Sequence, residues 1–230
     1  PREAAVLSLN SAFKNGRFVN LELDSTIKKY GFEDKDKSFY TRLLYGTVEK
    51  KLTLDWYLSK ISKTALADIE PLVRCILETA LYQIFEMDRV PDSAACNEAT
   101  ELVKKLCPGS YAGFVNAILR NTVRKKAALR AELQTLPGLS GTSVRHSIPL
   151  WICQKWESDY GQGSAEQIAH GFESIPPHLT LHINTLKITA DEYLAKLDAS
   201  LCPRKIGETL ITLSGSAPVE SLPGFEEGLF

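Results

Sequence analysis

The stretch Asp68–Met87, DIEPLVRCILETALYQIFEM, decides the fold of the first half of the chain. Its apolar residues recur at the i, i+3, i+4, i+7 spacing of one helix face, without a gap. They are Ile69, Leu72, Val73, Ile76, Leu77, Ala80, Leu81, Ile84 and Phe85. Asp68 suits the N-cap, and Pro71 falls in the first turn, where its missing N–H costs little. Such a continuous stripe predicts a helix at the centre of a bundle.

Further helices are expected on both sides of this one, because apolar residues and capping residues follow the same pattern. They cover Ala4–Lys14, Val19–Tyr30 with Gly31 as C-cap, Asp36–Lys50, Leu54–Ser62 with Thr53 as cap, Asp92–Leu106, Ser110–Lys126 and Leu129–Thr135, with a break at Pro108-Gly109. No strand-like alternation interrupts residues 1–135. The sequence therefore predicts an all-α domain over 1–135.

The pattern changes after Leu136–His146, LPGLSGTSVRH, whose Gly, Pro, Ser and Thr content predicts a linker at 136–146. Two helices are expected next, at Ser147–Tyr160 and Ser164–Glu173. Alternating apolar residues predict strands at Leu179–Ile183 and Thr209–Leu213, and Thr189 with Glu192 forms a capping box for a helix over Ala190–Leu197. The sequence predicts a small α+β domain over 147–230.

The composition is that of an ordinary globular protein, with 44% hydrophobic and 24% charged residues. No apolar run approaches the ~20 residues of a membrane helix, and no signal segment opens the chain. We expect a cytoplasmic protein without a membrane partner. The five cysteines are widely spaced, with no Cys-x-x-Cys pair, so we expect apolar fillers of a reduced core and no metal site.

The net charge of -1 hides an uneven distribution of charge along the chain. Residues 1–135 carry 21 Lys and Arg against 17 Asp and Glu, whereas residues 136–230 carry 6 against 11. The stretch Leu102–Ala131 holds seven basic residues and no acidic one. A local basic patch on a near-neutral protein indicates a face that binds a polyanion. A solvated helix face is the alternative interpretation.

Arg120 and Arg124 lie one helical turn apart and face away from the inward stripe of Phe114 and Ile118. Arginine suits phosphate because its planar fork donates two hydrogen bonds at once. Phe114 either stacks on an RNA base, as aromatic residues do in single-stranded RNA recognition, or belongs to the core. The candidate RNA-binding residues are Arg120, Arg124, Lys125, Lys104, Lys105, Phe114 and Asn116.

No motif for catalysis emerges from the 230 residues. The sequence has no Gly-rich phosphate loop, no His-Glu-x-x-His and no Ser/His/Asp set with a local signature. We therefore assign no catalytic, cofactor-binding or metal-binding residue.

Three strings resemble signature stretches of the NusB-like all-α RNA-binding fold. They are SFYTRLLYGTVEKKLTLDWYL (Ser38–Leu58), ILETALYQIFEMDRVPDSAACNEATELVKKL (Ile76–Leu106) and GFVNAILRN (Gly113–Asn121). They occur in the family order and together cover most of residues 1–135. The resemblance implies that this first domain binds RNA.

Three later strings narrow the family. PLWICQKWESDYG (Pro149–Gly161), LTLHINTLKITADEYLAKL (Leu179–Leu197) and LPGFEEGLF (Leu222–Phe230) resemble the region that links a NusB-like domain to the catalytic domain of RsmB/Sun-type 16S ribosomal RNA cytosine-5 methyltransferases. That region has an RNA-recognition-like α+β character. The resemblance implies 16S ribosomal RNA and the enzyme's own C-terminal methyltransferase domain as partners. It implies S-adenosylmethionine as cofactor of the parent enzyme, and none for this chain.

Two departures from the family pattern have consequences. His182 stands where family members usually have arginine, so a phosphate contact there is weaker or depends on pH. In the family, the string matching GFEEGLF is followed by the methyltransferase fold, with its Gly-rich cofactor loop and two catalytic cysteines. These 230 residues hold neither. We expect this chain to be a truncated, RNA-binding part that is inactive by itself.

Two other interpretations stay open at this point. A NusB-like transcription antitermination factor binds RNA together with a ribosomal protein, but it resembles only residues 1–135. Alternatively, the helical domain is a docking platform for the catalytic domain and has little affinity for RNA. Salt-dependent binding of RNA separates the first interpretation from the docking platform.

Overall fold

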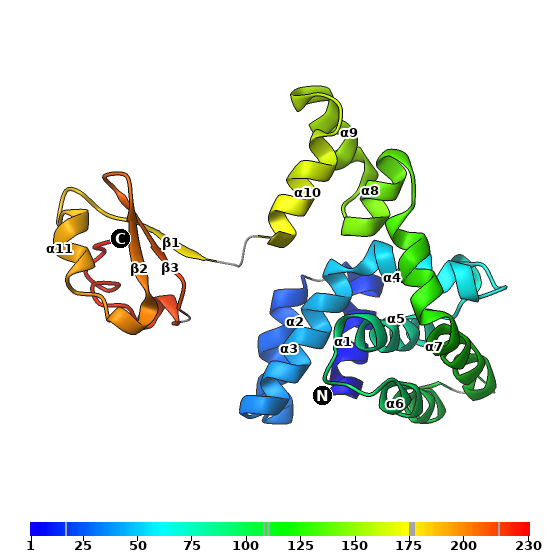
Figure 1. Ribbon diagram of the computed structural model, residues 1–230. Coiled ribbons are helices and arrows are strands. Elements are labelled where there is room, and N and C mark those ends of the chain that lie inside the picture. Colours follow the sequence, from blue (N-terminus) through cyan, green and yellow to red (C-terminus); the bar gives the residue numbers. More distant parts are fainter. Residues whose placement is uncertain (17, 108, 110, 175–177, 216) are drawn as a thin grey trace. The chain divides into compact units, whose positions relative to one another are not determined.

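A computed structural model describes residues 1–16, 18–107, 109, 111–174, 178–215 and 217–230. The chain divides into two compact units, a helical unit (Pro1–His170) and a sheet unit (Gly171–Phe230). The described part of the first is built from helices, and the second contains a three-stranded antiparallel sheet (Figure 1). The predicted fold class, an all-α domain followed by a small α+β subdomain, is confirmed.

The helical unit is a bundle around one central helix. Its elements are α1 (Arg2–Asn15), α2 (Val19–Tyr30), α3 (Asp34–Glu49), α4 (Lys51–Ile61), the 3-10 turn η1 (Leu66–Asp68), α5 (Pro71–Glu86), α6 (Asp92–Leu106), α7 (Ala112–Gln134), α8 (Gly138–His146), α9 (Leu150–Tyr160) and α10 (Ser164–Ser174), which continues into the sheet unit. The helix predicted from the apolar stripe is α5. It packs against α1, α3, α4, α6 and α7, so it occupies the centre of the bundle as predicted.

Every residue of α5 from Cys75 to Phe85 is buried, the polar ones included. Thr79 donates from its hydroxyl to the Cys75 carbonyl at 2.7 Å, and the Gln83 amide donates to the Thr79 carbonyl at 3.0 Å. Gln83 also accepts a hydrogen bond from Arg2 of α1 at 2.7 Å. These bonds matter because a buried polar group without a partner costs about 1–3 kcal/mol.

A buried cluster of four charges ties α4 to α5. The Glu78 side chain is fully buried, and its Oε1 accepts from Lys51 Nζ at 2.7 Å and from Arg74 Nε at 2.8 Å. Both cations also reach Asp55, at 2.8 Å and 2.7 Å. Burial raises the pKa of Glu78 to about 7, despite these two cations. The cluster is thus a desolvated network in which each charge depends on the others.

Helices α3 and α5 approach each other closely at Gly46. A Cβ atom at this position would lie 2.1 Å from the ring and hydroxyl of Tyr82 on α5. The Tyr82 ring also lines a cavity between α3 and α5, so a larger residue at position 46 would have to displace the ring toward this cavity. Glycine at position 46 thus allows the close approach of the two helices.

Several predicted helix ends shift in the structure. The N-cap of α5 is Glu70, whose carboxylate accepts from the Val73 amide at 2.8 Å, and not Asp68, which belongs to η1. Thr53 lies inside α4 and donates to the Val144 carbonyl at 2.6 Å, so it is not a cap. The two helices expected between 110 and 135 are one continuous helix, α7. Pro108 and Ser110, expected to end one helix and begin the next, lie outside the described residues.

Within the predicted linker over Leu136–His146, residues Gly138–His146 form α8. Gly141, Thr142 and Ser143 are buried there, and α8 packs against α4 and α7. A Cβ atom at Gly141 would lie 2.2 Å from the Leu136 carbonyl oxygen. The small residues that suggested a loop are therefore used for close packing.

Glu166 of α10 links the C-terminal end of the helical unit to α8 through side-chain contacts. Its carboxylate accepts from Thr142 at 2.6 Å and from Arg145 at 2.9 Å, and it pairs with His146 at 3.1 Å. The Arg145 guanidinium lowers the pKa of Glu166 to about 2. These contacts place α9 and the first part of α10 in the helical unit, although the sequence suggested the second domain.

The sheet unit has three short strands in the order β1-β3-β2, all antiparallel. Its elements are β1 (Leu179–His182), α11 (Ala190–Leu194), the 3-10 turn η2 (Ala199–Leu201), β2 (Pro203–Ile206), β3 (Leu210–Leu213) and the 3-10 turn η3 (Val219–Ser221). The predicted capping box of Thr189 and Glu192 is present at α11. Strand β2 was not predicted.

Alternate residues of the strands form a buried core with α11. It comprises Leu181, Ile183, Ala190, Tyr193, Leu197, Ile211, Leu213 and Leu222. The last residues of the chain complete it, since Asn184 donates from its backbone to the Leu229 carbonyl at 2.8 Å and Tyr193 donates to the Pro223 carbonyl at 2.9 Å. The string Leu222–Phe230 is thus part of this core.

Replacing Arg74 with methionine should lower the free energy of unfolding by about 3 kcal/mol, because the change leaves the buried Glu78 carboxylate with one cation fewer. Urea unfolding monitored by circular dichroism measures the difference. Lys60→Met, which breaks the exposed pair with Glu132, serves as control and should cost less than about 1 kcal/mol. Equal losses in the two variants would contradict a special role for the buried cluster.

Glu166→Gln should remove a pH-dependent part of the stability of the helical unit. The pKa of Glu166 is lowered from its ordinary 4.5 to about 2 in the fold. The stabilisation is therefore present above pH 4.5 and is lost as pH falls toward 2. Urea unfolding at several pH values from 6 to 3 should show a difference between wild type and variant that shrinks on acidification. A difference that grows instead would refute the assignment.

Candidate nucleic-acid interface

The candidate basic residues of α7 are exposed on one side of the helix. Arg120 and Arg124 are one turn apart and exposed, whereas Ile118, Leu119 and Thr122 on the other side are buried. The exposed neighbours Gly113, Ala117, Ala127, Ala128 and Ala131 are small. No bulky residue of α7 flanks them there, so both arginines are accessible on this side of the helix.

Of the seven basic residues between Leu102 and Ala131, three are already paired with acidic side chains and a fourth is bound to a backbone carbonyl. Lys104 pairs with Glu101 and Lys105 with Glu3, each at 2.6 Å. Lys126 pairs with Asp92 at 3.0 Å, and Arg130 donates to the Phe85 carbonyl. Lys104 and Lys105 are exposed partners of exposed pairs, so they stay accessible but are partly neutralised.

The remaining three basic residues, Arg120, Arg124 and Lys125, form what we call the α7 basic face. Among the described residues, no acidic side chain pairs with any of them. Arg124 donates to the Asn121 side chain at 2.8 Å, which holds it along the helix without cancelling its charge. Three neighbouring exposed cations give a surface suited to consecutive phosphates of a polyanion.

Phe114 is half-buried and packs against the hydrophobic core of the helical unit. Of the two roles considered for it, the structure therefore supports packing. Asn116, one of the sequence candidates, is also half-buried on α7. The structure thus separates the seven candidates into three free cations, two paired lysines and two half-buried residues.

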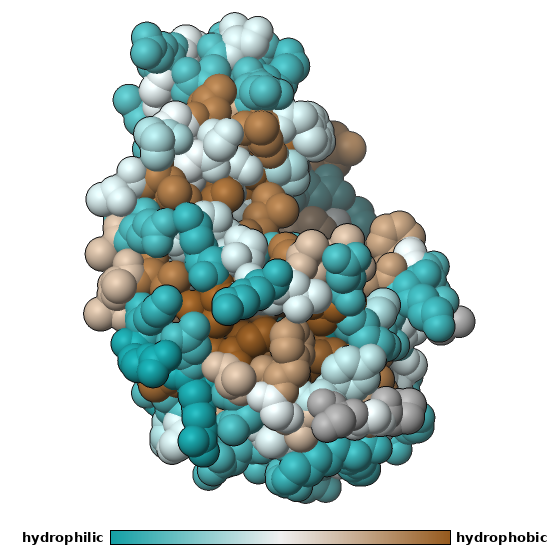
Figure 2. Space-filling model, turned by 90° about the vertical axis from the view of Figure 1, so that its right-hand side faces the viewer, coloured by the Kyte–Doolittle hydropathy of each residue, from teal (hydrophilic) through white to brown (hydrophobic). Residues whose placement is uncertain are grey.

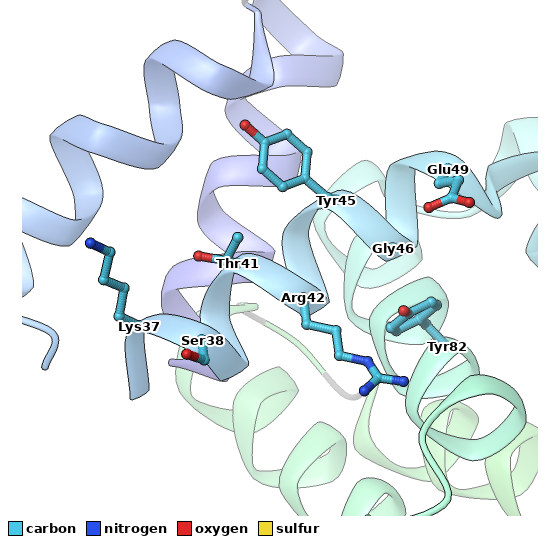
Figure 3. Close-up of a pocket in the computed structure, with 8 residues that line it drawn as sticks. All are labelled: Lys37, Ser38, Thr41, Arg42, Tyr45, Gly46, Glu49 and Tyr82. Atoms are coloured by element: carbon cyan, nitrogen blue, oxygen red, sulfur yellow. The ribbon is translucent and has the colours of Figure 1, made fainter. Parts of the chain in front are cut away.

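Sequence reasoning missed two cavities of the helical unit. One, of about 680 Å³, lies between α1, α4, η1 and α5 and includes Phe13, Lys14 and Glu78. Another, of about 480 Å³, lies between α3 and α5, and Figure 3 shows Arg42, Tyr45 and Tyr82 among the residues that line it. The basic residues that line these cavities are far apart in the sequence or next to acidic residues. No stretch of like charge in the sequence therefore indicates the cavities.

Figure 2 shows the side of the molecule where α7 and the α4–α5 connection lie, with hydrophilic side chains around a hydrophobic hollow.

In the sheet unit, His182 is exposed on the face of β1 opposite the buried Leu181. No group of three or more potential metal ligands occurs within the described ranges. None of the helices that the structure describes is long and apolar enough to cross a membrane.

The helical unit has the fold of a solved NusB structure. Against T. maritima NusB the TM-score is 0.50 at 22% sequence identity, over 54% of this chain and 92% of that one. The sequence profile of the NusB family matches residues 1–124, and that of the Methyltr_RsmF/B-like, ferredoxin-like domain matches residues 148–220. The chain belongs to the NusB family.

Similar curated proteins have the two matched regions within a longer chain. The probable ribosomal RNA small subunit methyltransferase B of Bacillus subtilis is 32% identical over 86% of this chain and 43% of its own length. The one from Synechocystis is 28% identical over 99% of this chain and 51% of its own length. This chain therefore spans about half the length of these relatives. The predicted resemblance to the N-terminal region of RsmB/Sun-type enzymes is confirmed.

Replacing Phe114 with alanine should lower the free energy of unfolding by about 2 kcal/mol, since its ring packs on the core. Arg120→Gln, on the exposed face of the same helix, should stay within about 0.5 kcal/mol of wild type. Urea unfolding of the two variants tests this. A Phe114→Ala variant as stable as wild type would return Phe114 to the list of base-stacking candidates.

Proposed function

We propose that this chain is the RNA-binding portion of an S-adenosylmethionine-dependent 16S ribosomal RNA cytosine-5 methyltransferase of the cytoplasm. In this role it grips and orients the RNA for a catalytic domain of the same protein. The NusB-family match and the relatives named ribosomal RNA small subunit methyltransferase B support the proposal. The single observation that carries RNA contact is the α7 basic face.

The α7 basic face suits RNA backbone better than it suits a base. Its groups are guanidinium and ammonium donors, which pair with phosphate oxygens. No exposed aromatic residue accompanies them on α7, since Phe114 packs inward. Contacts of this kind position an RNA without reading its sequence. The sequence specificity of the parent enzyme must then come from other contacts.

In this proposal, methyl transfer belongs to a domain in the part of the relatives that this chain does not cover. No residue of this chain is assigned to S-adenosylmethionine or to the reacting cytosine. A target base inside a duplex must be turned out of the stack before its C5 atom is accessible. A rigid, basic platform that holds the neighbouring phosphates would support this step, because it keeps the RNA in place while the base moves.

The antitermination-factor alternative is weaker, because a profile of an RsmF/B-like domain matches residues 148–220 in addition to the NusB match. The docking-platform alternative predicts that the α7 basic face contacts protein rather than RNA. Binding measurements with RNA therefore decide between this alternative and our proposal.

Neutralising two cations of the face with Arg120→Gln and Arg124→Gln should weaken binding of a 16S ribosomal RNA fragment and flatten its salt dependence. Each lost phosphate contact should reduce the log–log slope by roughly 0.7–0.9. Fluorescence anisotropy at salt concentrations from about 50 to about 300 mM, over which the screening length shortens markedly, measures the affinity for RNA and its salt dependence.

The matched control removes two other exposed charges of the same unit, with Lys28→Gln and Lys35→Gln. These lysines lie on α2 and α3, whereas α7 packs against α4, α5, α6 and α8. Equal losses from the two double variants would indicate non-specific attraction. Unchanged RNA binding by the arginine variant would favour the docking platform.

A further inference from the structure

The cavity between α1, α4, η1 and α5 has features that the proposed function does not use. Its volume of about 680 Å³ lies within the roughly 300–1,000 Å³ of small-ligand sites. One wall is apolar, with Leu66, Ile69 and Leu72 from η1 and α5. The opposite side carries Phe13 and Lys14 from the end of α1. An apolar cavity with a few convergent polar groups is the usual form of a binding site.

Phe13 presents an aromatic ring to this cavity. The residue is 43% exposed, so part of its ring is accessible to a bound molecule. The ammonium group of Lys51 lies 5.3 Å from its ring centroid, so one side of the ring is held by a cation. Lys14 is exposed at the same edge, and no acidic side chain among the described residues pairs with it. The edge thus offers a ring for stacking and a cation for a phosphate.

Glu78 supplies a polar group that lacks a partner. Its Oε1 is bound by Lys51 and Arg74, whereas its Oε2 is buried and has no hydrogen-bond partner within the described part of the chain. Buried polar atoms in folded proteins are nearly always satisfied. Glu78 lines the cavity, but its side chain has no accessible surface, so an exocyclic amine of a bound base becomes the missing donor once neighbouring side chains of the cavity shift.

We propose that this cavity binds a single unstacked RNA nucleotide whose base carries an exocyclic amine. The base stacks at Phe13, the amine donates to Glu78, and the phosphate pairs with Lys14. A carboxylate accepts readily from the N4 amine of cytosine, and adenine and guanine carry comparable amines. Uracil has no amine, and its N3–H group stands between two carbonyl oxygens that a carboxylate repels, so it binds less well. The inference deepens the proposed function, because it adds a base contact to a unit whose α7 basic face contacts phosphates.

The second cavity, between α3 and α5, fits a nucleotide less well. It also combines tyrosines with Lys37 and Arg42, but Glu49 lies at its edge (Figure 3). None of the side chains described there has a buried polar atom without a partner. Tyr45 is 41% exposed, close to the value for Phe13, so it offers a matched control.

The test titrates the intact chain with cytidine, adenosine and uridine 5′-monophosphates and follows ring and methyl NMR signals near Phe13. We expect saturable shifts at Phe13 and Leu66, with tighter binding of cytidine and adenosine than of uridine monophosphate. Phe13→Ala combined with Lys14→Gln should weaken cytidine monophosphate binding about tenfold, in line with the loss of one stacking contact. Tyr45→Ala should leave it unchanged. Glu78→Gln should remove the preference for amine-bearing bases.

Absence of saturable shifts at Phe13, or an equal loss in Tyr45→Ala, would overturn the inference. Phe13 and Lys14 are exposed enough that their double variant should fold even if Glu78→Gln does not. The Arg120→Gln, Arg124→Gln variant separates this test from that of the proposed function. That variant should keep mononucleotide binding while its RNA binding weakens. A wild-type chain that binds mononucleotides but not RNA would contradict the proposed function and support the cavity site. RNA binding through the α7 basic face without mononucleotide binding would support the proposed function and contradict the cavity site.

Discussion

Side chains from Cys75 to Phe85 on α5 are all withdrawn from water, so each polar group in that run needs a partner inside the protein. The surrounding helices supply these partners as well as apolar surface. Arg2 reaches Gln83 from α1, and Lys51 reaches Glu78 from α4. Packing against α5 therefore also sets the rotation and position of its neighbours. A helix that slid by one turn would leave a charge or an amide unsatisfied.

The distribution of charge in the fold differs from its distribution in the sequence. Residues 102–131 look uniformly basic, yet acids from distant segments, Glu3 and Asp92, neutralise two of the lysines. The positive charge that stays without an acidic partner is confined to α7, in Arg120, Arg124, Lys125 and Arg130, the last of which donates to the Phe85 carbonyl. The cavity beside α1 shows the opposite case, since its cations come from α1, α4 and α5 and never form a run. Local composition predicts neither arrangement, because ion pairs form between segments that only the fold brings together.

The elements that could be predicted from the sequence are those whose structure is specified by residues close together in the chain. The apolar stripe of α5, the left-handed Gly31 after α2 and the capping box at Thr189 all specify their structure within a few residues. The failures come from tertiary contacts. Gly141 suggested a loop, but it allows α8 to approach the Leu136 carbonyl. Strand β2 has a proline and two basic residues in four positions, and only pairing with β3 makes it a strand. Likewise, exposed arginines could be chosen from periodicity, whereas the unpartnered Glu78 oxygen could not.

The small sheet leaves both of its outer strands without a further neighbour among the described residues, since β3 alone lies in the middle. An unpaired strand is a template for association with another chain. Here each outer strand is only four residues long, and β2 begins with Pro203, which cannot donate a backbone hydrogen bond. Arg204 adds a charge at the same edge, whereas Lys205 is paired with Asp191 at 2.6 Å. The irregular sequence of β2 thus disfavours pairing with a further strand, so its poor strand propensity becomes a means of closing the sheet at this edge.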